Sequence, residues 1–314
     1  MRRLHWASIG ERGTLIGMLA MVRIRRLLGH WPFRLVLRPV IVWYFLSHGV
    51  ARRASRDYLR RLDPTRPRHA LTEWRRSYQH FMSFGQTLMD KVTAWSGEPR
   101  REPLRGQGMA NMEHAVRQRR GGLILVAHHG NLDIVNALGS QHAGFQLTVL
   151  MHLHNAQKFN QLLERATGRP RPEVLEVTDI TPATAQHLDA RIRDGGFVVI
   201  AADRVPLGVG RTRTLEFLGA PAPFPEGPFR LATLLRCPLY TLSCVRDDDA
   251  FQVDFEPFDD TTNLPRRARE DWITDAMQRH ADHLAARVRR HPLQWFNFFS
   301  FWHDDTDSHH DPTR

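Results

Sequence analysis

The segment GGLILVAHHGNLDIVNALG, residues 121–139, decides the fold that we expect for this chain. Its apolar run at residues 123–127 has the length and composition of a strand covered on both faces. After a polar turn, an apolar pattern at helical spacing resumes at Leu132. In open α/β sheets ligands bind where strands end, and this turn carries His128 and, five positions later, Asp133. We therefore expect a functional site at this turn.

From this segment to residue 290, short apolar runs alternate with amphipathic stretches. The pattern predicts strands at residues 123–127, 147–151, 174–177, 197–201, 239–245 and 251–255. Between and after them it predicts helices at residues 132–139, 156–167, 183–194, 229–236 and 269–290. This alternation indicates the α/β class, with a mainly parallel mixed sheet flanked by helices.

The charge balance favours an anionic partner. The 314 residues carry a formal net charge of +11, and nearly all of the positive charge is arginine. A membrane surface, nucleic acid or an acidic carrier protein would suit this balance, although an arginine bias can also reflect genomic base composition. Nucleic acid is not expected, because the aromatic residues cluster with apolar runs instead of interleaving with arginine. Two cysteines, Cys237 and Cys244, form neither a disulfide framework nor a metal site and favour a reducing compartment.

The N-terminal part is the most apolar long segment. Its richest stretches, residues 13–22 and 35–46, are separated or interrupted by arginines, whereas a membrane-spanning helix needs about 20 nearly uncharged residues. Aromatic residues beside these arginines suit a helix that lies in the lipid headgroup region. Packing as a helical hairpin on the protein's own core is the alternative, and both can hold together. Residues 51–61 and 71–95 also have helical character, the first of them strongly basic.

These patterns predict three parts. Residues 1–62 form an N-terminal apolar helical membrane-associating segment at the membrane interface. Residues 63–306 form an α/β domain contiguous with the N-terminal helices, and residues 307–314 form a disordered polar tail.

The pair of His128 and Asp133 has the chemistry of a general base and the carboxylate that orients it. Imidazole titrates near neutrality, and a carboxylate can fix its tautomer and stabilise the imidazolium. No protein nucleophile is evident nearby, so we expect direct transfer to an acceptor instead of a covalent intermediate. A metal held by His128, His129 and Asp133 is the alternative, but no H-x3-H or C-x2-C pattern supports it, and we expect no metal.

Two further stretches of the sequence, residues 203–213 and 219–229, carry candidate binding residues. Asp203 and Arg204 come directly after the predicted strand at 197–201; they could pair with each other, or Arg204 could bind an anionic group. We expect residues 208–213 to form a flexible basic loop at the substrate's edge. Residues 219–229 are predicted as a proline-stiffened loop that leads into a helix, where N–H groups near Glu226 and Gly227 could receive an anion.

Taken in order, the blocks resemble a known pattern. His128-x4-Asp133, residues 196–204, FPEG at 224–227 and CPL at 237–239 resemble the four blocks of the lysophospholipid acyltransferase superfamily. HHGNLD at residues 128–133 is most similar to the branch of late lipid A acyltransferases, where H-x-G-N-x-[E/D] is usual. The FPEG block is similar to that of the glycerol-phosphate branch, but Pro228 and Phe229 stand where threonine and arginine would follow. Nearly end to end, including residues 6–13 and 294–299, the chain resembles a bacterial subgroup of predicted acyltransferases.

The resemblance implies a membrane-associated O-acyltransferase on the cytoplasmic face of the bacterial inner membrane. The acyl donor would be acyl carrier protein or acyl-CoA, the acceptor a hydroxyl of a lipid or glycolipid, and no metal or prosthetic group would be needed. His128 would be the catalytic base oriented by Asp133. The residues implied to bind the acyl group, the oxyanion or the acceptor are Asn131, Asp203, Arg204, Glu226 and Gly227.

Two alternatives to this function stay open. A thioesterase would use the same His128 and Asp133 with water as the acceptor. A non-enzymatic anionic-lipid-binding protein would depend on the charge alone. The closing aromatic residues, 295–302, could line an acyl groove, dip into lipid or seal a hydrophobic edge of the sheet.

Overall fold

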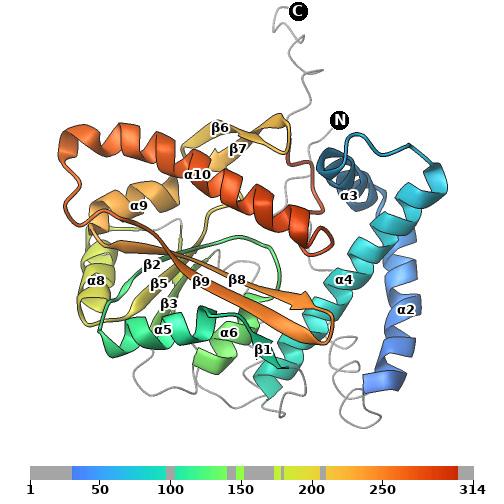
Figure 1. The fold of residues 1–314 in the computed structure, drawn as a ribbon, viewed down its shortest axis with the longest axis horizontal. Coiled ribbons are helices and arrows are strands. Elements are labelled where there is room, and N and C mark those ends of the chain that lie inside the picture. Colours follow the sequence, from blue (N-terminus) through green and yellow to red (C-terminus); the bar gives the residue numbers. More distant parts are fainter. Residues whose placement is uncertain are drawn as a thin grey trace, which may run out of the picture.

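A seven-stranded mixed sheet forms the centre of the molecule (Figure 1). The computed structural model describes residues 30–96, 103–139, 146–151, 173–177, 180–205 and 210–302. The strands of the sheet are β1 (Leu104–Arg105), β2 (Gly122–Val126), β3 (Leu147–Met151), β4 (Glu173–Glu176), β5 (Phe197–Ala201), β8 (Pro238–Asp247) and β9 (Ala250–Asp260). Across the sheet they lie in the order β1-β9-β8-β2-β5-β3-β4. The predicted α/β class with a mainly parallel mixed sheet is confirmed.

The parallel core of the sheet brings the ends of β2 and β5 together. Strands β8, β2, β5, β3 and β4 run parallel, and β9 returns antiparallel to β8. The last residue of β2, Val126, lies opposite the last residue of β5, Ala201. Residues at the same distance beyond these two strands are therefore neighbours.

Helices cover both faces of the sheet. On one side lie α5 (Gly108–Arg117) and α6 (Leu132–Gly139), and on the other α8 (Pro182–Arg193), α9 (Gly227–Leu235) and α10 (Arg269–Arg290), which follows the short 3-10 turn Arg266–Ala268 (Figure 1). Alternate residues of β2 serve the two faces: Leu123 and Leu125 pack in the cluster with α8–α10, and Ile124 and Val126 in the cluster with α5 and α6. This burial on both faces explains the unbroken apolar run in the sequence.

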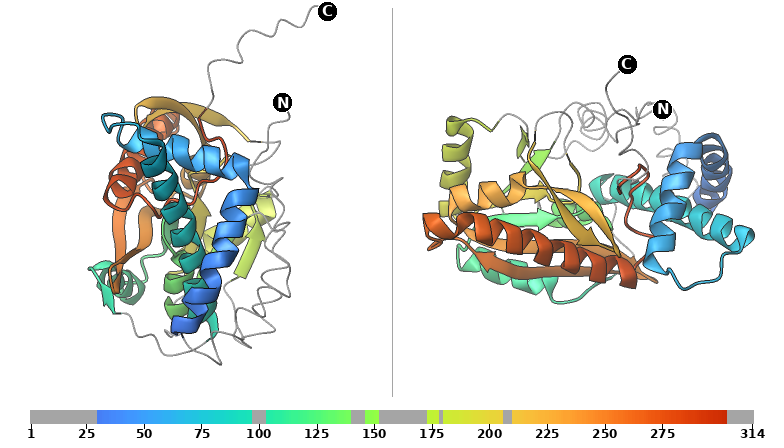
Figure 2. Two further views of the ribbon diagram at one scale, coloured as in Figure 1. Left: turned by 90° about the vertical axis from the view of Figure 1, so that its right-hand side faces the viewer. Right: turned by 90° about the horizontal axis from the view of Figure 1, so that it is seen from above.

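Between residues 30 and 96, three helices lie beside the sheet. They are α2 (His30–Ser47), α3 (Gly49–Leu62) and α4 (Ala70–Ser96), and α4 packs against α6 (Figures 1 and 2). One face of α2 is buried through Leu37, Ile41 and Phe45, so packing on the protein's own core is confirmed for this helix. In the part of the chain that the structure describes, no helix combines the length and apolar character that crossing a membrane requires.

Two predicted loops contain strands. Residues 212–213, predicted as part of a flexible basic loop, begin β6 (Thr212–Phe217), and most of the proline-stiffened loop forms β7 (Ala220–Pro225), which pairs antiparallel with β6. The prolines stand at every second position of β7, so their nitrogens, which carry no hydrogen, all face the edge of the strand away from β6. That alternation makes a proline-rich strand possible, and the loop prediction was wrong here. β1 and α5 were not predicted.

Several expectations fall outside the described residues. They are the helix at 156–167, the apolar stretch at 13–22, residues 208–209 of the basic loop, and the tail at 307–314. The predicted division into residues 1–62, 63–306 and 307–314 stays a prediction.

Candidate active site

His128 and Asp203 meet at the carboxyl ends of two neighbouring strands. Because Val126 lies opposite Ala201, the residues two positions beyond each strand come together. Nδ1 of His128 lies 2.8 Å from Oδ1 of Asp203. The Asp203 side chain is completely buried, whereas the His128 side chain is 40% exposed. The pair therefore presents its imidazole, and not its carboxylate, at the molecular surface.

The carboxylate of Asp203 is fixed through both oxygens. Oδ2 accepts the backbone N–H of His128 at 2.9 Å and the indole N–H of Trp295 at 3.0 Å. Oδ1 faces Nδ1 of His128, and since an ionised carboxylate can only accept hydrogen bonds, Nδ1 carries the proton. This tautomer leaves Nε2 as the basic nitrogen of the ring.

The turn after β2 is held by the backbone of two other segments, β8 and the residues after α10. Gly130 has φ +78°, and a Cβ there would lie 2.0 Å from the carbonyl oxygen of Cys244, so only glycine fits. The N–H of Gly130 donates to the carbonyl of Gln294, and the N–H of Phe296 donates to the carbonyl of His128. The segment after α10 thus locks the turn that carries the imidazole.

The electrostatics keep His128 neutral and Asp203 ionised at neutral pH. The protein around His128 partly desolvates its imidazolium and lowers the pKa below its ordinary 6.5, and the positive charge of Arg204 lowers it further, while the charge and hydrogen bond of Asp203 oppose them. For Asp203, burial alone would raise the pKa. At the low pH where this carboxylate would titrate, the charge of protonated His128 and its hydrogen bonds, with the charge of Arg204, hold the pKa well below its usual range. A neutral imidazole beside an ionised carboxylate is the state that a general base needs.

Asp133 lies in the first turn of α6 and forms an ion pair with Lys91 of α4, with Nζ 3.0 Å from Oδ2. A carboxylate at a helix N-terminus is favourable in itself. The hydrogen bond to Nδ1 of His128 that we expected from Asp133 is made by Asp203 in this structure. Lys91 lowers the pKa of His128, and Asp133 is a carboxylate partner of Lys91.

Asn131 and Arg204 flank the pair and hold main-chain carbonyls. Asn131 is buried and donates its side-chain amide to the carbonyl of Thr87 on α4 at 3.1 Å. Arg204 donates through Nη2 to the carbonyl of Phe296 at 2.7 Å, and its guanidinium lies over the ring of Phe299. Both residues therefore lie next to the His128 turn and stabilise its surroundings.

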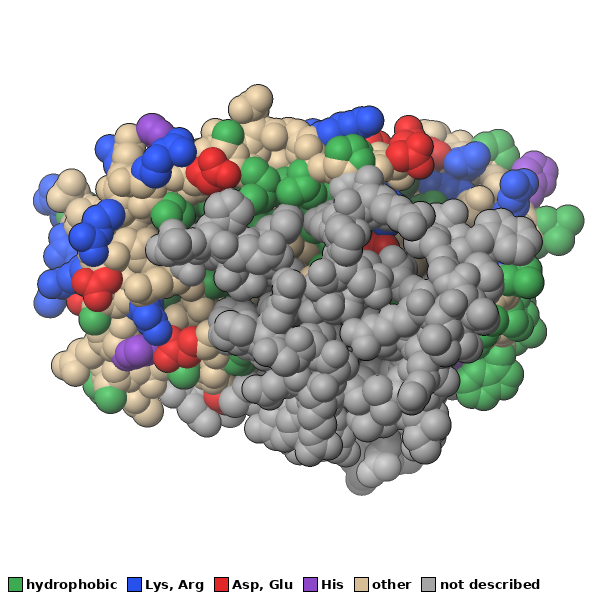
Figure 3. All heavy atoms as spheres, turned by 90° about the horizontal axis from the view of Figure 1, so that it is seen from below, with side chains coloured by type: hydrophobic (Ala, Val, Ile, Leu, Met, Phe, Trp, Pro, Cys, Tyr) green, Lys and Arg blue, Asp and Glu red, His purple; other side chains and the backbone are tan. Residues whose placement is uncertain are grey.

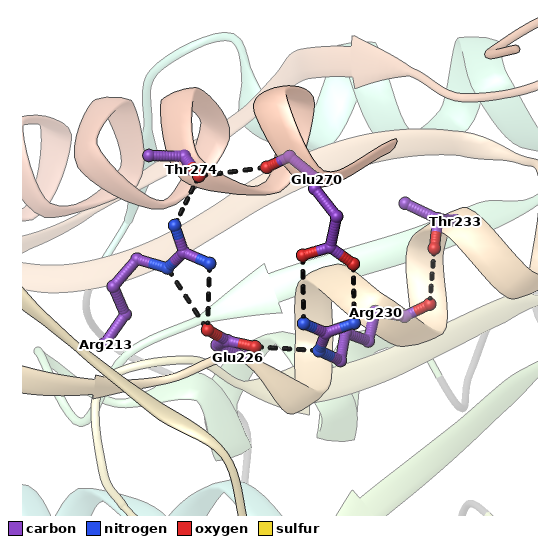
Figure 4. Close-up of polar contacts among 6 residues, drawn as sticks. All are labelled: Arg213, Glu226, Arg230, Thr233, Glu270 and Thr274. Carbon is purple, nitrogen blue, oxygen red and sulfur yellow. Dashed lines mark hydrogen bonds and ion pairs between the residues drawn. The ribbon is translucent and has the colours of Figure 1, made fainter. Parts of the chain in front are cut away.

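Glu226 belongs to a different charged network (Figure 4). One carboxylate oxygen accepts from Arg213 of β6, at 3.0 Å, and the other from Arg230 of α9, at 2.7 Å. Arg230 also pairs with Glu270 on α10. Gly227 begins α9, where an added Cβ would meet open space. These contacts connect the β6–β7 hairpin to two helices, and the predicted role of Glu226 and Gly227 in acceptor binding stays a prediction.

His129, the neighbour of the base, faces the α10 side. It is buried, its Nε2 lies 3.3 Å from the carbonyl of His291, and burial lowers its pKa to about 4. With Ser243, Asp254 and Arg287 it lines a polar cavity of about 210 Å³. The two adjacent histidines thus point in different directions, His128 toward Asp203 and His129 toward this cavity.

Trp295 and Lys91 are the site residues that sequence reasoning missed. Trp295 was included only in a run of aromatic residues with a choice of general roles. Lys91 carries a weak signal, as one of two lysines in an arginine-rich chain. The pairing of His128 with Asp203 had a clearer signal: both residues stand two positions beyond buried strands of five residues.

The comparison with protein families covers this whole site. The model of bacterial lipid A biosynthesis acyltransferases matches residues 67–304, which include both strand ends, the residues around them and Trp295. A search of curated proteins found no match. The predicted resemblance to the lipid A branch is confirmed, since the matched span is well over half of the chain. The chain belongs to the bacterial lipid A biosynthesis acyltransferase family.

Proposed function

We propose that this acyltransferase moves an acyl chain from a thioester of acyl carrier protein or coenzyme A directly to a hydroxyl of a lipid A precursor or related glycolipid. The family supplies the reaction class. The observation that supports His128 as general base is its Nδ1 contact with the buried Asp203, which directs Nε2 outward. Both oxygens of Asp203 can keep their hydrogen bonds throughout the reaction.

The reaction follows from the state of the imidazole. Nε2 of His128 accepts the proton of the acceptor hydroxyl as its oxygen attacks the thioester carbonyl carbon. Asp203 stabilises the imidazolium that forms, without taking its proton. The tetrahedral intermediate then collapses, its carbon–sulfur bond breaks, and the imidazolium returns a proton to the leaving thiolate. The products are the acyl ester and the free thiol, and the enzyme regains its starting state.

The oxyanion of that intermediate needs hydrogen-bond donors. We assign this role to Arg204 and Asn131, which both lie next to the His128 turn. Guanidinium and amide N–H groups are hydrogen-bond donors of the kind that stabilise an oxyanion. We propose that Asp133 influences His128 indirectly, through its ion pair with Lys91. We also propose that Glu226 and Gly227 form the edge of the acceptor site.

We propose that α2 and α3 contact the bilayer. The family is associated with the bacterial inner membrane. On α2, Leu35, Trp43 and Leu46 expose 57%, 68% and 58% of their surface, and Figure 3 shows hydrophobic side chains gathered at the end where α2 lies. Exposed arginines, among them Arg38 and Arg53, lie on the same helices and suit anionic headgroups. Cys237 and Cys244 are buried and form no disulfide, which fits the cytoplasmic face.

Co-sedimentation with anionic vesicles tests this surface. Trp43→Glu should weaken vesicle binding about tenfold, because it places a charge where an indole enters the headgroup region. Leu234→Glu is the matched control, since Leu234 is similarly exposed but lies on α9. Equal binding by both variants would contradict the assignment of α2 to the bilayer.

The catalytic assignment is tested by turnover of the purified full-length protein with an acyl thioester and a lipid A precursor. His128→Ala should lower acyl transfer by about 10²–10⁴-fold, the usual contribution of a general base. His114→Ala, an exposed histidine of α5, is the control and should leave turnover unchanged. Retained transfer by His128→Ala would overturn the mechanism. Rapid release of free acid without acceptor would identify a thioesterase instead.

A further inference from the structure

The segment that follows α10 crosses directly over the catalytic turn. Two backbone hydrogen bonds fix this segment against the turn: Gly130 donates to the carbonyl of Gln294, at 2.8 Å, and Phe296 donates to the carbonyl of His128, at 3.0 Å. Between these bonds, Trp295 pairs with His129 in an isolated antiparallel bridge. This register places the indole of Trp295 on the carboxylate of Asp203.

We propose that Trp295 is a positioning residue that limits how strongly Asp203 holds a proton on His128. Its indole N–H shares the negative charge on Oδ2 of Asp203, so less of that charge is available to the imidazolium. This inference rests on the proposed function of His128 as the base. Trp295 itself does not touch the reacting atoms.

The ring of Trp295 has little freedom to leave the carboxylate. It is 1% exposed and packs edge-on against Tyr58, Phe217 and Phe301, with ring centroids 4.9, 5.4 and 5.0 Å away. A buried indole N–H needs an acceptor, and Asp203 supplies it at 3.0 Å. The hydrogen bond is therefore enforced by packing from several elements.

The main chain of Trp295 is held by a second buried network. Ser77 donates to Oγ of Ser55, the hydroxyl of Ser55 lies 3.0 Å from Nδ1 of His80, and Nε2 of His80 lies 2.9 Å from the carbonyl of Trp295. Burial lowers the pKa of His80 to about 4, so its ring is neutral and donates through Nε2. Helices α3 and α4 thereby fix the position of Trp295 over the site.

The direction of the effect follows from the charges around His128. Asp203 stabilises the imidazolium, while Arg204 after β5 and Lys91 on α4 oppose it, and Asp133 on α6 pairs with Lys91. Replacing Trp295 leaves these charges in place and removes one donor from Asp203. The carboxylate then stabilises the imidazolium more strongly, which raises the pKa of His128.

The test compares Trp295→Phe with Trp302→Phe. Trp302 is the matched control, because it is buried in the same aromatic cluster and donates its indole N–H to the carbonyl of Phe217 at 3.1 Å. The readout is the acidic limb of the pH dependence of kcat/KM, together with an NMR titration of the His128 ring in the full-length protein. We expect Trp295→Phe to move both midpoints upward by about 1 pH unit and Trp302→Phe to leave them unchanged.

An unmoved midpoint in Trp295→Phe, or equal movement in both variants, would overturn the proposal. If Trp295→Phe does not fold, β-(3-benzothienyl)alanine at position 295 keeps the ring size and removes only the N–H donor. The NMR titration needs no turnover, and its resonance is assigned by its loss in His128→Ala. Failure of His128 as the base would appear as retained turnover in His128→Ala, and is thereby distinguished from failure of the role of Trp295.

Discussion

Asp203 and Glu226 are both buried carboxylates, but they serve different kinds of network. Asp203 accepts from an imidazole, an indole and a backbone N–H at the end of β5. Glu226 accepts from two arginines, Arg213 and Arg230, at the start of α9 (Figure 4). Histidine exchanges a proton near neutral pH, whereas arginine does not. Only the first of these two networks can therefore take part in proton transfer.

The direction of a pKa shift does not distinguish the two carboxylates. Burial acts to raise the pKa of both Asp203 and Glu226, and their cationic partners lower both pKa values overall. The identity and exposure of the partner make the distinction, because His128 is 40% exposed and titratable. A buried ion pair is thus a candidate for catalysis when one partner can change its charge and reach the surface.

The largest effect should come from Asp203→Asn. The amide replaces the acceptor of the Nδ1 proton, so the imidazole loses both its fixed tautomer and its charge partner, and kcat should fall by about 10³–10⁴-fold. Turnover of acyl thioester with acceptor measures this, and thermal unfolding checks that the fold is kept. A loss of less than about tenfold would remove Asp203 from the role of orienting carboxylate.

Glu226→Gln should instead affect stability. It removes the carboxylate that Arg213 and Arg230 share, while Arg230 keeps its pair with Glu270. Since both arginines are about one-third exposed, the free energy of unfolding should fall by only about 1–2 kcal/mol. Urea unfolding measures this, and kcat should change by less than about threefold, because Glu226 takes no part in proton transfer. A raised KM for the lipid acceptor would support the place of Glu226 at the edge of the acceptor site, whereas an unchanged KM would remove it from acceptor binding.

Asp133→Asn should have a smaller effect on catalysis than Asp203→Asn. It removes the countercharge of Lys91, whose positive charge then lowers the pKa of His128 further, and we expect a loss in kcat/KM of about tenfold. Adding Lys91→Gln should restore part of that loss. If Asp133→Asn exceeds Asp203→Asn in effect, the orienting role returns to Asp133.

The smallest effect is in the pH profile of the unmodified protein. Because the pKa of His128 lies below 6.5, the neutral base persists through pH 6.5 and is lost only as the pH falls further. More than half of the maximal kcat/KM should therefore remain at pH 6.5. Steady-state rates from about pH 5 to 8, with unfolding measured at each pH, test this. An acidic midpoint above 6.5 would show that Asp203 outweighs the partial desolvation of His128 and the charge of Arg204.

The strand, turn and helix around His128 were predictable because they depend on local patterns. The predicted strand at 197–201 and the helices at 132–139 and 269–290 have the boundaries that the structure shows. The β6–β7 hairpin was not predictable in the same way, because its prolines have the spacing of a loop as well as of an edge strand. A strand tolerates such prolines only when a single edge of it is paired, and pairing is not local.

The sequence by itself determined the fold class, the family and the imidazole, since hydrophobic period, motif order and residue type are properties of the chain. The tertiary structure decided which carboxylate serves that imidazole. Asp133 is nearer in sequence, but α6 carries it to Lys91, while the register of β2 with β5 brings Asp203 across 75 residues. It also decided that Trp295 lies on Asp203, because that contact depends on how a distant segment crosses the turn.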